Sequence, residues 1–126
     1  MSRNLPYLSI SHREVLEALI GIGPNIAFSR GDIQSMTNVS YKRMAEIIHC
    51  GELRFTYDSF SLEKADVRHS DKYYAFNSAN EQIPSLHGIE PMREYFYTTP
   101  EMVSRFSDIL CLDTSQKVTQ ILRHET

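Results

Sequence analysis

Residues 28–53, FSRGDIQSMTNVSYKRMAEIIHCGEL, constrain the possible folds more than any other stretch, because they contain two helix starts close together. Ser29, with Asp32 three residues later, matches a capping box in which the serine side chain accepts a hydrogen bond from the third backbone amide. Ser40 is a second residue of the type that favours a helix N-terminus. The stretch therefore predicts a short helix over 30–36, a tight turn, and a further helix beginning at Ser40.

Apolar residues in this stretch predict which helix faces are buried. Ile33 and Met36 lie three residues apart on one face of the first helix. The second helix carries an apolar stripe at helical spacing, formed by Met44, Ile47 and Ile48. Both faces are expected to pack into one core.

The preceding residues predict another helix. Ser9 or Ser11 can cap a helix that runs to about Ile20 and ends at the following glycines and proline. The short segment 26–28 is expected to contribute one or two bridges to a small sheet.

Two segments after the helices have strand character. Leu53–Tyr57 alternates between apolar and polar residues, as in a strand with one buried face. Lys72–Phe76 is rich in strand-forming aromatic residues and is the expected antiparallel partner. Part of the polar segment between them, around 65–69, is expected to extend this hairpin.

The remaining residues predict a linker and two helices. Residues 78–91 contain Pro84, Gly88 and Pro91, which disfavour regular structure. Residues 92–97 suggest a helical turn, Thr98 starts a helix, and a last helix begins at Asp113 or Thr114. We expect three regions: 9–77 as a domain, 78–91 as a linker, and 92–126 as a C-terminal helical extension.

The order helix, short extended piece, helix, turn, helix, strand, loop, strand resembles the winged helix-turn-helix family of bacterial and phage transcriptional regulators. The resemblance covers about residues 9–77, and residues 28–53 carry its most specific pattern. It implies an α+β fold, with a core of three helices and a β-hairpin wing followed by the two C-terminal helices. It also implies binding of double-stranded DNA, with the helix over 40–50 in the major groove.

Carried over by position, the resemblance implies two groups of DNA-binding residues. Arg43 is the first candidate for base contacts and Lys42 for phosphate contacts. The residues of the turn and helix are Thr37, Asn38, Ser40, Tyr41, Lys42, Arg43 and Glu46. Those of the wing are Lys64, Arg68, His69 and Lys72.

The charge distribution departs from that of a typical DNA-binding protein. Residues 1–77 hold nine Lys or Arg and nine Asp or Glu, and residues 78–126 hold four and seven. A neutral binding domain weakens binding by a monomer, whereas a homodimer joins two weak half-sites into one good site. The two C-terminal helices are either the dimer element or a cover for the core, because an amphipathic pattern does not identify what covers its apolar face.

Two other functions stay open. The neutral charge and acidic tail favour a winged-helix protein that has become a protein-binding module, an anti-activator or adaptor with little DNA affinity. Three consecutive aromatic residues, Tyr95, Phe96 and Tyr97, cannot all face one core from a single helical turn. They are expected to pack between the C-terminal segment and the winged core; the alternative is that they and the C-terminal helices form a surface for a protein partner. The third function is a regulator with a small effector bound between the core and those helices.

Composition excludes several classes of protein. The chain has 126 residues, 41% of them hydrophobic, which suits one folded domain. No apolar run approaches the roughly 18–20 residues that cross a bilayer, and no signal peptide is apparent, so we expect a cytoplasmic protein without membrane contact.

Nothing in the sequence indicates an enzyme, a cofactor or a metal site. Cys50 and Cys111 are far apart, are expected to be buried thiols, and do not stand with the five histidines at zinc-site spacing. Nucleophile elbows, phosphate-binding glycine loops and zinc-protease motifs are absent from the sequence.

Overall fold

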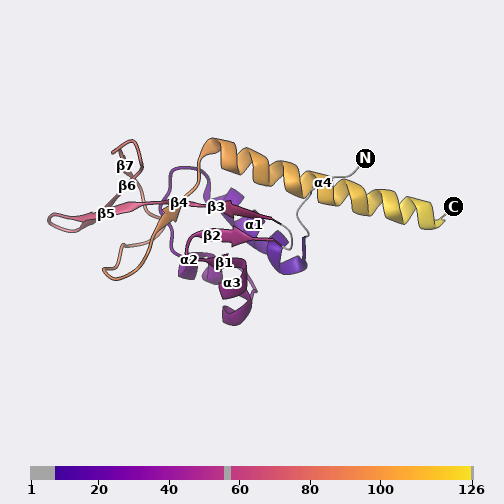
Figure 1. The fold of residues 1–126 in the computed structure, drawn as a ribbon, viewed down its shortest axis with the longest axis horizontal. Coiled ribbons are helices and arrows are strands. Elements are labelled where there is room, and N and C mark those ends of the chain that lie inside the picture. Colours follow the sequence, from indigo (N-terminus) through magenta and orange to yellow (C-terminus); the bar gives the residue numbers. More distant parts are fainter. Residues whose placement is uncertain (1–7, 56–57, 126) are drawn as a thin grey trace.

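The computed structural model describes residues 8–55 and 58–125, with side chains as far as Leu112. Within these residues the fold is mixed α+β, with four helices and small antiparallel sheets (Figure 1). The elements, in chain order, are α1 (Ile10–Ile22), α2 (Arg30–Met36), α3 (Tyr41–Ile47), β1 (Ile48–His49), β2 (Glu52–Arg54), β3 (Ser59–Ser61), β4 (Glu63–Lys64), β5 (Asp66–His69), β6 (Tyr73–Phe76), β7 (Gln82–Ile83), β8 (Phe96–Tyr97) and α4 (Pro100–Glu125).

Serine side chains cap the first three helices. Ser9, one of the two expected candidates, accepts a hydrogen bond from the third amide of α1 at 3.1 Å, and Ser40 does the same for α3 at 3.2 Å. Ser29 and Asp32 form the expected capping box on α2, at 3.2 and 2.8 Å. These helix starts are confirmed, since each is fixed by a hydrogen bond that the local sequence specifies.

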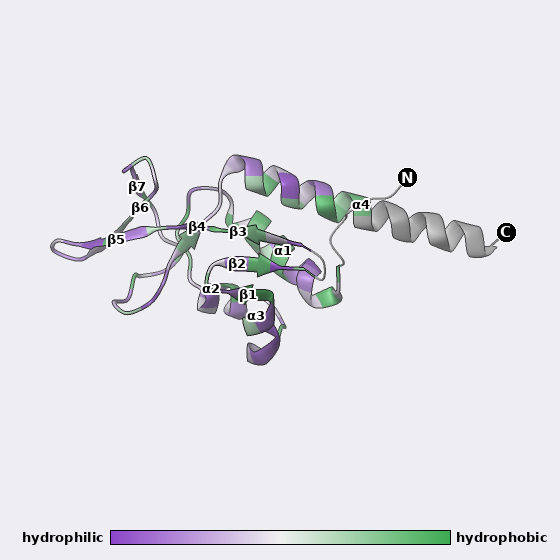
Figure 2. Ribbon diagram, in the orientation of Figure 1, coloured by the Kyte–Doolittle hydropathy of each residue, from purple (hydrophilic) through white to green (hydrophobic). Residues whose placement is uncertain are grey.

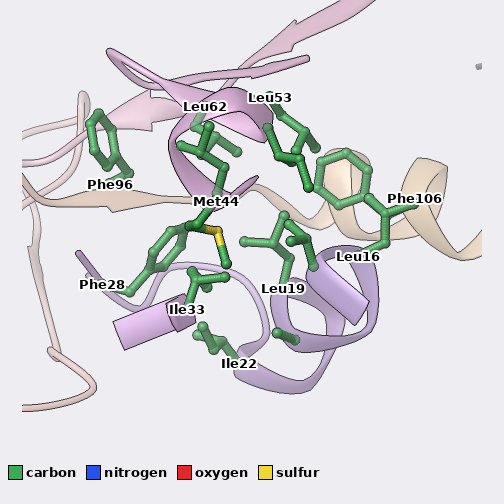
Figure 3. Packing of buried hydrophobic residues seen from close by; sticks show 14 of the residues in the cluster. Leu16, Leu19, Ile22, Phe28, Ile33, Met44, Leu53, Leu62, Phe96 and Phe106 are labelled. Atoms are coloured by element: carbon green, nitrogen blue, oxygen red, sulfur yellow. The ribbon is translucent and has the colours of Figure 1, made fainter. Parts of the chain in front are cut away.

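The main core lies between the first three helices, the strands that follow them, and α4 (Figure 3). The predicted inner stripe of α3 is buried, as is Ile33 of α2. Met36, in contrast, is 46% exposed, so its predicted burial is wrong. It is the last residue of a helix of seven residues, and the chain turns away at Thr37 before the core can cover it.

β2 pairs with β3 and not with the predicted partner. Leu53 lies opposite Phe60, and the Phe55 amide donates to the Asp58 carbonyl at 2.8 Å to close the turn. The predicted pairing of 53–57 with 72–76 is therefore wrong. A strand that follows directly is a better partner than a distant one, because less chain entropy is lost when a short loop closes.

The predicted partner strand, β6, lies in a separate hairpin. β5 and β6 pair antiparallel, with β7 on the other side of β6. In Figure 1 this β5–β6 arm projects from one end of the molecule, away from α3. The chain from β3 through β5 thus contacts three partners in turn: β2, then β8, then β6.

β8 explains how three consecutive aromatic residues are all buried. Tyr95, Phe96 and Tyr97 are 3, 6 and 2% exposed, so the predicted helical turn is wrong and the alternative that these aromatic residues pack inside the fold is the correct one. Neighbouring side chains of an extended segment point to opposite sides. Phe96 accordingly joins the main core, whereas Tyr95 and Tyr97 join a second, smaller core with Ala65 and Ile83.

The predicted linker is part of the fold. Within 78–91, β7 pairs with β6, and Ser85 forms a parallel bridge with Ala27. Phe28 bridges Phe96 in the antiparallel sense. The bridges expected at 26–28 are confirmed, and their partners are residues of the supposed linker and extension.

One helix replaces the two predicted at the C-terminus. α4 runs without interruption through Asp113 and Thr114, because no glycine or proline occurs between 101 and 125. Its Phe106 and Ile109 are buried in the main core. Among the described residues, no helix combines the length and the apolar character needed to span a membrane.

Candidate nucleic-acid interface

The first turn of α3 is exposed to solvent. Tyr41 is 73% exposed, and Ser40 and Lys42 are also exposed, while Met44 and Ile47 on the opposite face are buried. Figure 2 shows hydrophilic residues at this end of α3. The helix therefore presents a polar first turn to solvent because its apolar stripe fixes its orientation on the core.

The turn before α3 is held by α1. The Asn38 amide donates to the Glu14 carboxylate at 2.8 Å, and the Val39 amide donates to the Thr37 hydroxyl at 3.4 Å. Val39 is buried between the helices. The turn and α3 are therefore held in a fixed arrangement, as a binding surface requires.

Arg43 is not free on the surface. Its guanidinium donates to the Glu46 carboxylate at 3.1 Å and to the Ser9 hydroxyl at 3.3 Å. Its side chain is 38% exposed. The first candidate for base contacts is therefore tied to α1 and to the acidic residue of its own helix, and these contacts would have to be exchanged for a base edge.

His12 extends this network into the protein. A carbonyl oxygen can only accept, so His12 Nε2 donates to the Arg54 carbonyl at 2.7 Å and Nδ1 accepts from the Ser9 hydroxyl at 2.8 Å. Burial lowers the pKa of His12, the bond to the Arg54 carbonyl opposes that change, and the Arg43 guanidinium lowers it further. The His12 side chain thus joins α1 to β2, and its lowered pKa favours the neutral imidazole.

The four residues predicted to line a wing lie outside the hairpin that follows α3. Lys64, on β4, pairs with Glu94 at 3.2 Å. Arg68, on β5, pairs with Asp66 at 2.8 Å and lies 4.1 Å over the Phe76 ring. These cations are partly neutralised by their neighbours.

The tip of the β5–β6 arm holds the other two. His69 lies beside the Tyr73 ring, with centroids 4.6 Å apart, and the Lys72 ammonium lies 5.6 Å from the Tyr74 ring. The Tyr74 hydroxyl donates to Asp71 at 2.8 Å, which lowers the pKa of Asp71 and raises that of Tyr74. The structure therefore brings together the residues of the turn and α3, and separates them from the arm.

Three basic residues outside the predicted set lie closer to α3. Arg30, His49 and Arg93 line a groove that also contains Tyr41, with a cavity volume of ≈ 500 Å³. Arg30 follows the Ser29 cap, so its place at a helix start was readable from the sequence. His49 and Arg93 gave no comparable signal, because His49 reaches the groove from β1, within the segment predicted as helix, and Arg93 from a loop within the predicted C-terminal extension.

Both cysteines are exposed, so the expectation of buried thiols is wrong. Cys50 occupies the turn between β1 and β2 with φ of 51°, and Cys111 lies on α4. α3 ends at Ile47, so the predicted helix over 40–50 is too long, and Cys50 lies in an exposed turn after it. Within the described residues, no three potential ligands of the His, Cys, Asp and Glu types stand together as a metal site would require.

Comparison with known proteins gave no match: no protein-family model, no curated protein sequence and no solved structure is similar to the chain.

Proposed function

We propose that this protein is a small DNA-binding transcriptional regulator of the winged helix-turn-helix type. One observation carries the proposal: α3 turns its apolar stripe inward and leaves Ser40, Tyr41 and Lys42 exposed on its first turn. Such a turn is the part of a recognition helix that meets base edges in the major groove. The order α1, α2, α3 and then an antiparallel hairpin supports the same assignment.

The wing of this proposal is the hairpin β2–β3, which follows α3 after the short strand β1. It carries one cation, Arg54, paired with Glu52 at 2.9 Å, and the exposed Asp58. A hairpin of this charge adds little attraction for phosphate, so most of the affinity has to come from the helical face. Lys42 is exposed there and no acidic partner of it is found among the described residues.

A homodimer completes the proposal. α4 extends from the core beyond the rest of the molecule (Figure 1), and its sequence continues with Val118, Ile121 and Leu122 at helical spacing. A second copy paired through this end would place two α3 helices on one duplex. Two weak half-sites would then combine into one site of useful affinity.

The test is a titration of random-sequence duplex DNA, followed by fluorescence anisotropy at two salt concentrations. We expect salt-dependent binding that Lys42→Ala weakens and that Lys72→Ala, on the arm, leaves close to the wild-type value. Sequence selection from the same pool should give a consensus that Arg43→Ala relaxes. A folded protein that binds no duplex at low salt would contradict the proposal.

A protein-docking module is the second candidate, and two exposed apolar side chains favour it. Met36 is 46% and Tyr41 73% exposed, at the end of α2 and the start of α3. Aromatic residues and methionine are enriched where proteins meet. This function would be supported if the protein binds no DNA, and if the wild type captures a partner that Tyr41→Ala and Met36→Ala fail to capture. Ile10→Ala is the matched control, because Ile10 is another exposed apolar residue, at 76%.

A further inference from the structure

The groove beside α3 has walls from four separate segments. The start of α2 contributes Arg30, α3 contributes Tyr41, β1 contributes His49, and the loop before β8 contributes Met92 and Arg93. Phe96 also lines the groove, and its ring would lie 2.7 Å from a Cβ on Gly51. Because these segments are continuous with residues of the two hydrophobic cores, the fold itself fixes the shape of the groove.

Arg30 brings positive charge to this groove that no acidic residue neutralises within the described part of the chain. Its guanidinium donates to the Ile48 carbonyl at 3.4 Å and lies 5.8 Å from the centre of the Tyr41 ring. Both contacts leave most of its donors available. A guanidinium in this state favours a ligand with several acceptor oxygens.

Arg93 lies next to Arg30 along the first turn of α2. A Cβ on Gly31 would stand 3.4 Å from Arg93 Nη1, so the guanidinium lies against the glycine that follows Arg30. Arg93 pairs with Glu90 at 3.0 Å, but the two side chains are 55 and 62% exposed. Exposed ion pairs contribute little stability, so this one can be exchanged for a stronger anion at small cost.

Arginine side chains supply the positive charge of this groove. The capping box of α2 joins Ser29 and Asp32 to each other, and the Asp32 carboxylate also contacts His87 at 2.9 Å. Glu94, the acidic residue in the groove, is paired with Lys64 at 3.2 Å. With two arginines and one glutamate, the side chains that line the groove carry a net positive charge.

We propose that this groove holds a phosphodiester of the DNA backbone between Arg30 and Arg93, next to the base-contacting turn of α3. The proposal rests on the proposed function and adds to it a site for the ligand's backbone. Tyr41 belongs to both surfaces, which makes the groove continuous with α3. Met92, fully exposed with φ of 74°, lies at the rim, where its apolar side chain suits the sugar of a nucleotide.

The competing basic surface is the β5–β6 arm, and its geometry is less suitable. Arg68 is engaged by Asp66 and Phe76, and the arm projects away from α3 (Figure 1). A duplex seated on α3 would meet the groove first. The two surfaces can therefore be compared by removing two cations from each.

The experiment measures duplex binding against salt concentration for the wild type, for Arg30→Gln with Arg93→Gln, and for Arg68→Gln with Lys72→Gln as the matched control. Affinity falls as the salt concentration rises, and loss of two phosphate contacts should make the slope of log affinity against log salt less steep by about 2. We expect that decrease in the groove variant and a wild-type slope in the arm variant. Thermal unfolding of each variant checks that it is folded.

Alkylation of Cys50 provides a second readout on the unaltered protein. Cys50 lines the groove and Cys111 lies on α4, and both are exposed. Bound DNA should slow the reaction of Cys50 with iodoacetamide several-fold while Cys111, quantified by peptide mass spectrometry in the same sample, keeps its rate.

The outcomes separate the two proposals. A wild type that binds DNA, with an unchanged slope in the groove variant or unprotected Cys50, overturns the phosphate site and leaves the regulator proposal standing. If the slope becomes less steep in the arm variant instead, the phosphate contact belongs to the arm; this result also overturns the phosphate site in the groove and leaves the regulator proposal standing. A wild type that binds no duplex but binds an acidic peptide, with loss in the groove variant, overturns both and assigns the groove to a protein partner.

Discussion

His12 is a buried residue of α1 whose side chain is hydrogen-bonded to the Arg54 carbonyl of β2, and this position predicts a pH dependence. Its folded-state pKa lies below the ordinary value of 6.5 because the imidazole is buried, so the unfolded chain binds the proton more readily. The free energy of unfolding should therefore be highest above pH 6.5 and should fall as the pH drops from there toward the folded-state pKa.

Denaturant unfolding between pH 7.5 and 5 measures this effect. His12→Gln should remove its part of the pH dependence, whereas His69→Gln, on the exposed arm, should retain it. An unchanged pH profile in His12→Gln would show that other groups cause the loss of stability at low pH.

Gly51 is a second residue with a specific physical role. Its φ of 80° is strained for other residues, and an added Cβ would lie 2.7 Å from the buried Phe96 ring. Gly51→Ala should cost about 1–3 kcal/mol of unfolding free energy, because backbone strain and a clash act together. Gly21→Ala is the matched control: nothing lies within 4 Å of its Cβ, and alanine in helix α1 should stabilise by about 0.5–1 kcal/mol. Equal stability of the two variants would contradict this account.

At the scale of elements, α2 depends on its cap. Ser29 is 4% exposed and accepts from the Asp32 amide, so Ser29→Ala should destabilise by about 0.5–2 kcal/mol in denaturant unfolding. Ser35 lies in the same helix, is exposed and donates to the Gly31 carbonyl at 2.9 Å, so Ser35→Ala should be close to neutral. A loss for Ser35→Ala as large as that for Ser29→Ala would mean that the cap is not what stabilises α2.

Local and long-range signals differ in how well they predicted these elements. Caps at Ser29 and Ser40 act within one turn, so the sequence was sufficient to place α2 and the start of α3. Strand partners are chosen by the whole fold, and alternation in 53–57 and 72–76 did not state which segments pair. The burial of Tyr95 through Tyr97 was unpredictable for the same reason, because it needs two cores, one on each side of β8.

At the scale of the whole molecule, two extensions leave the main core: the β5–β6 arm and the end of α4 (Figure 1). The arm is supported by its own small core, and α4 by Phe106 and Ile109 near its start. With 26 residues α4 is about 39 Å long, which is more than the core covers. The candidate interface was only partly predictable at this scale. The position of α3 could be predicted from its local sequence, whereas Arg93 reaches the interface from a loop that is distant in the sequence.

The proposed dimer through α4 gives the last prediction. A chain ending at Leu112 keeps Phe106 and Ile109, which pack in the main core, so it should fold, but it should sediment as a monomer under conditions in which the full chain is a dimer. Replacing Ile121 and Leu122 by serine in the full chain should have the same effect, because the apolar stripe is lost. Replacing their neighbours Gln120 and Arg123 by serine keeps that stripe and should leave the dimer intact. Sedimentation velocity over a range of concentrations measures all four proteins, and a full chain that stays monomeric throughout would contradict the dimer and leave α3 with one half-site.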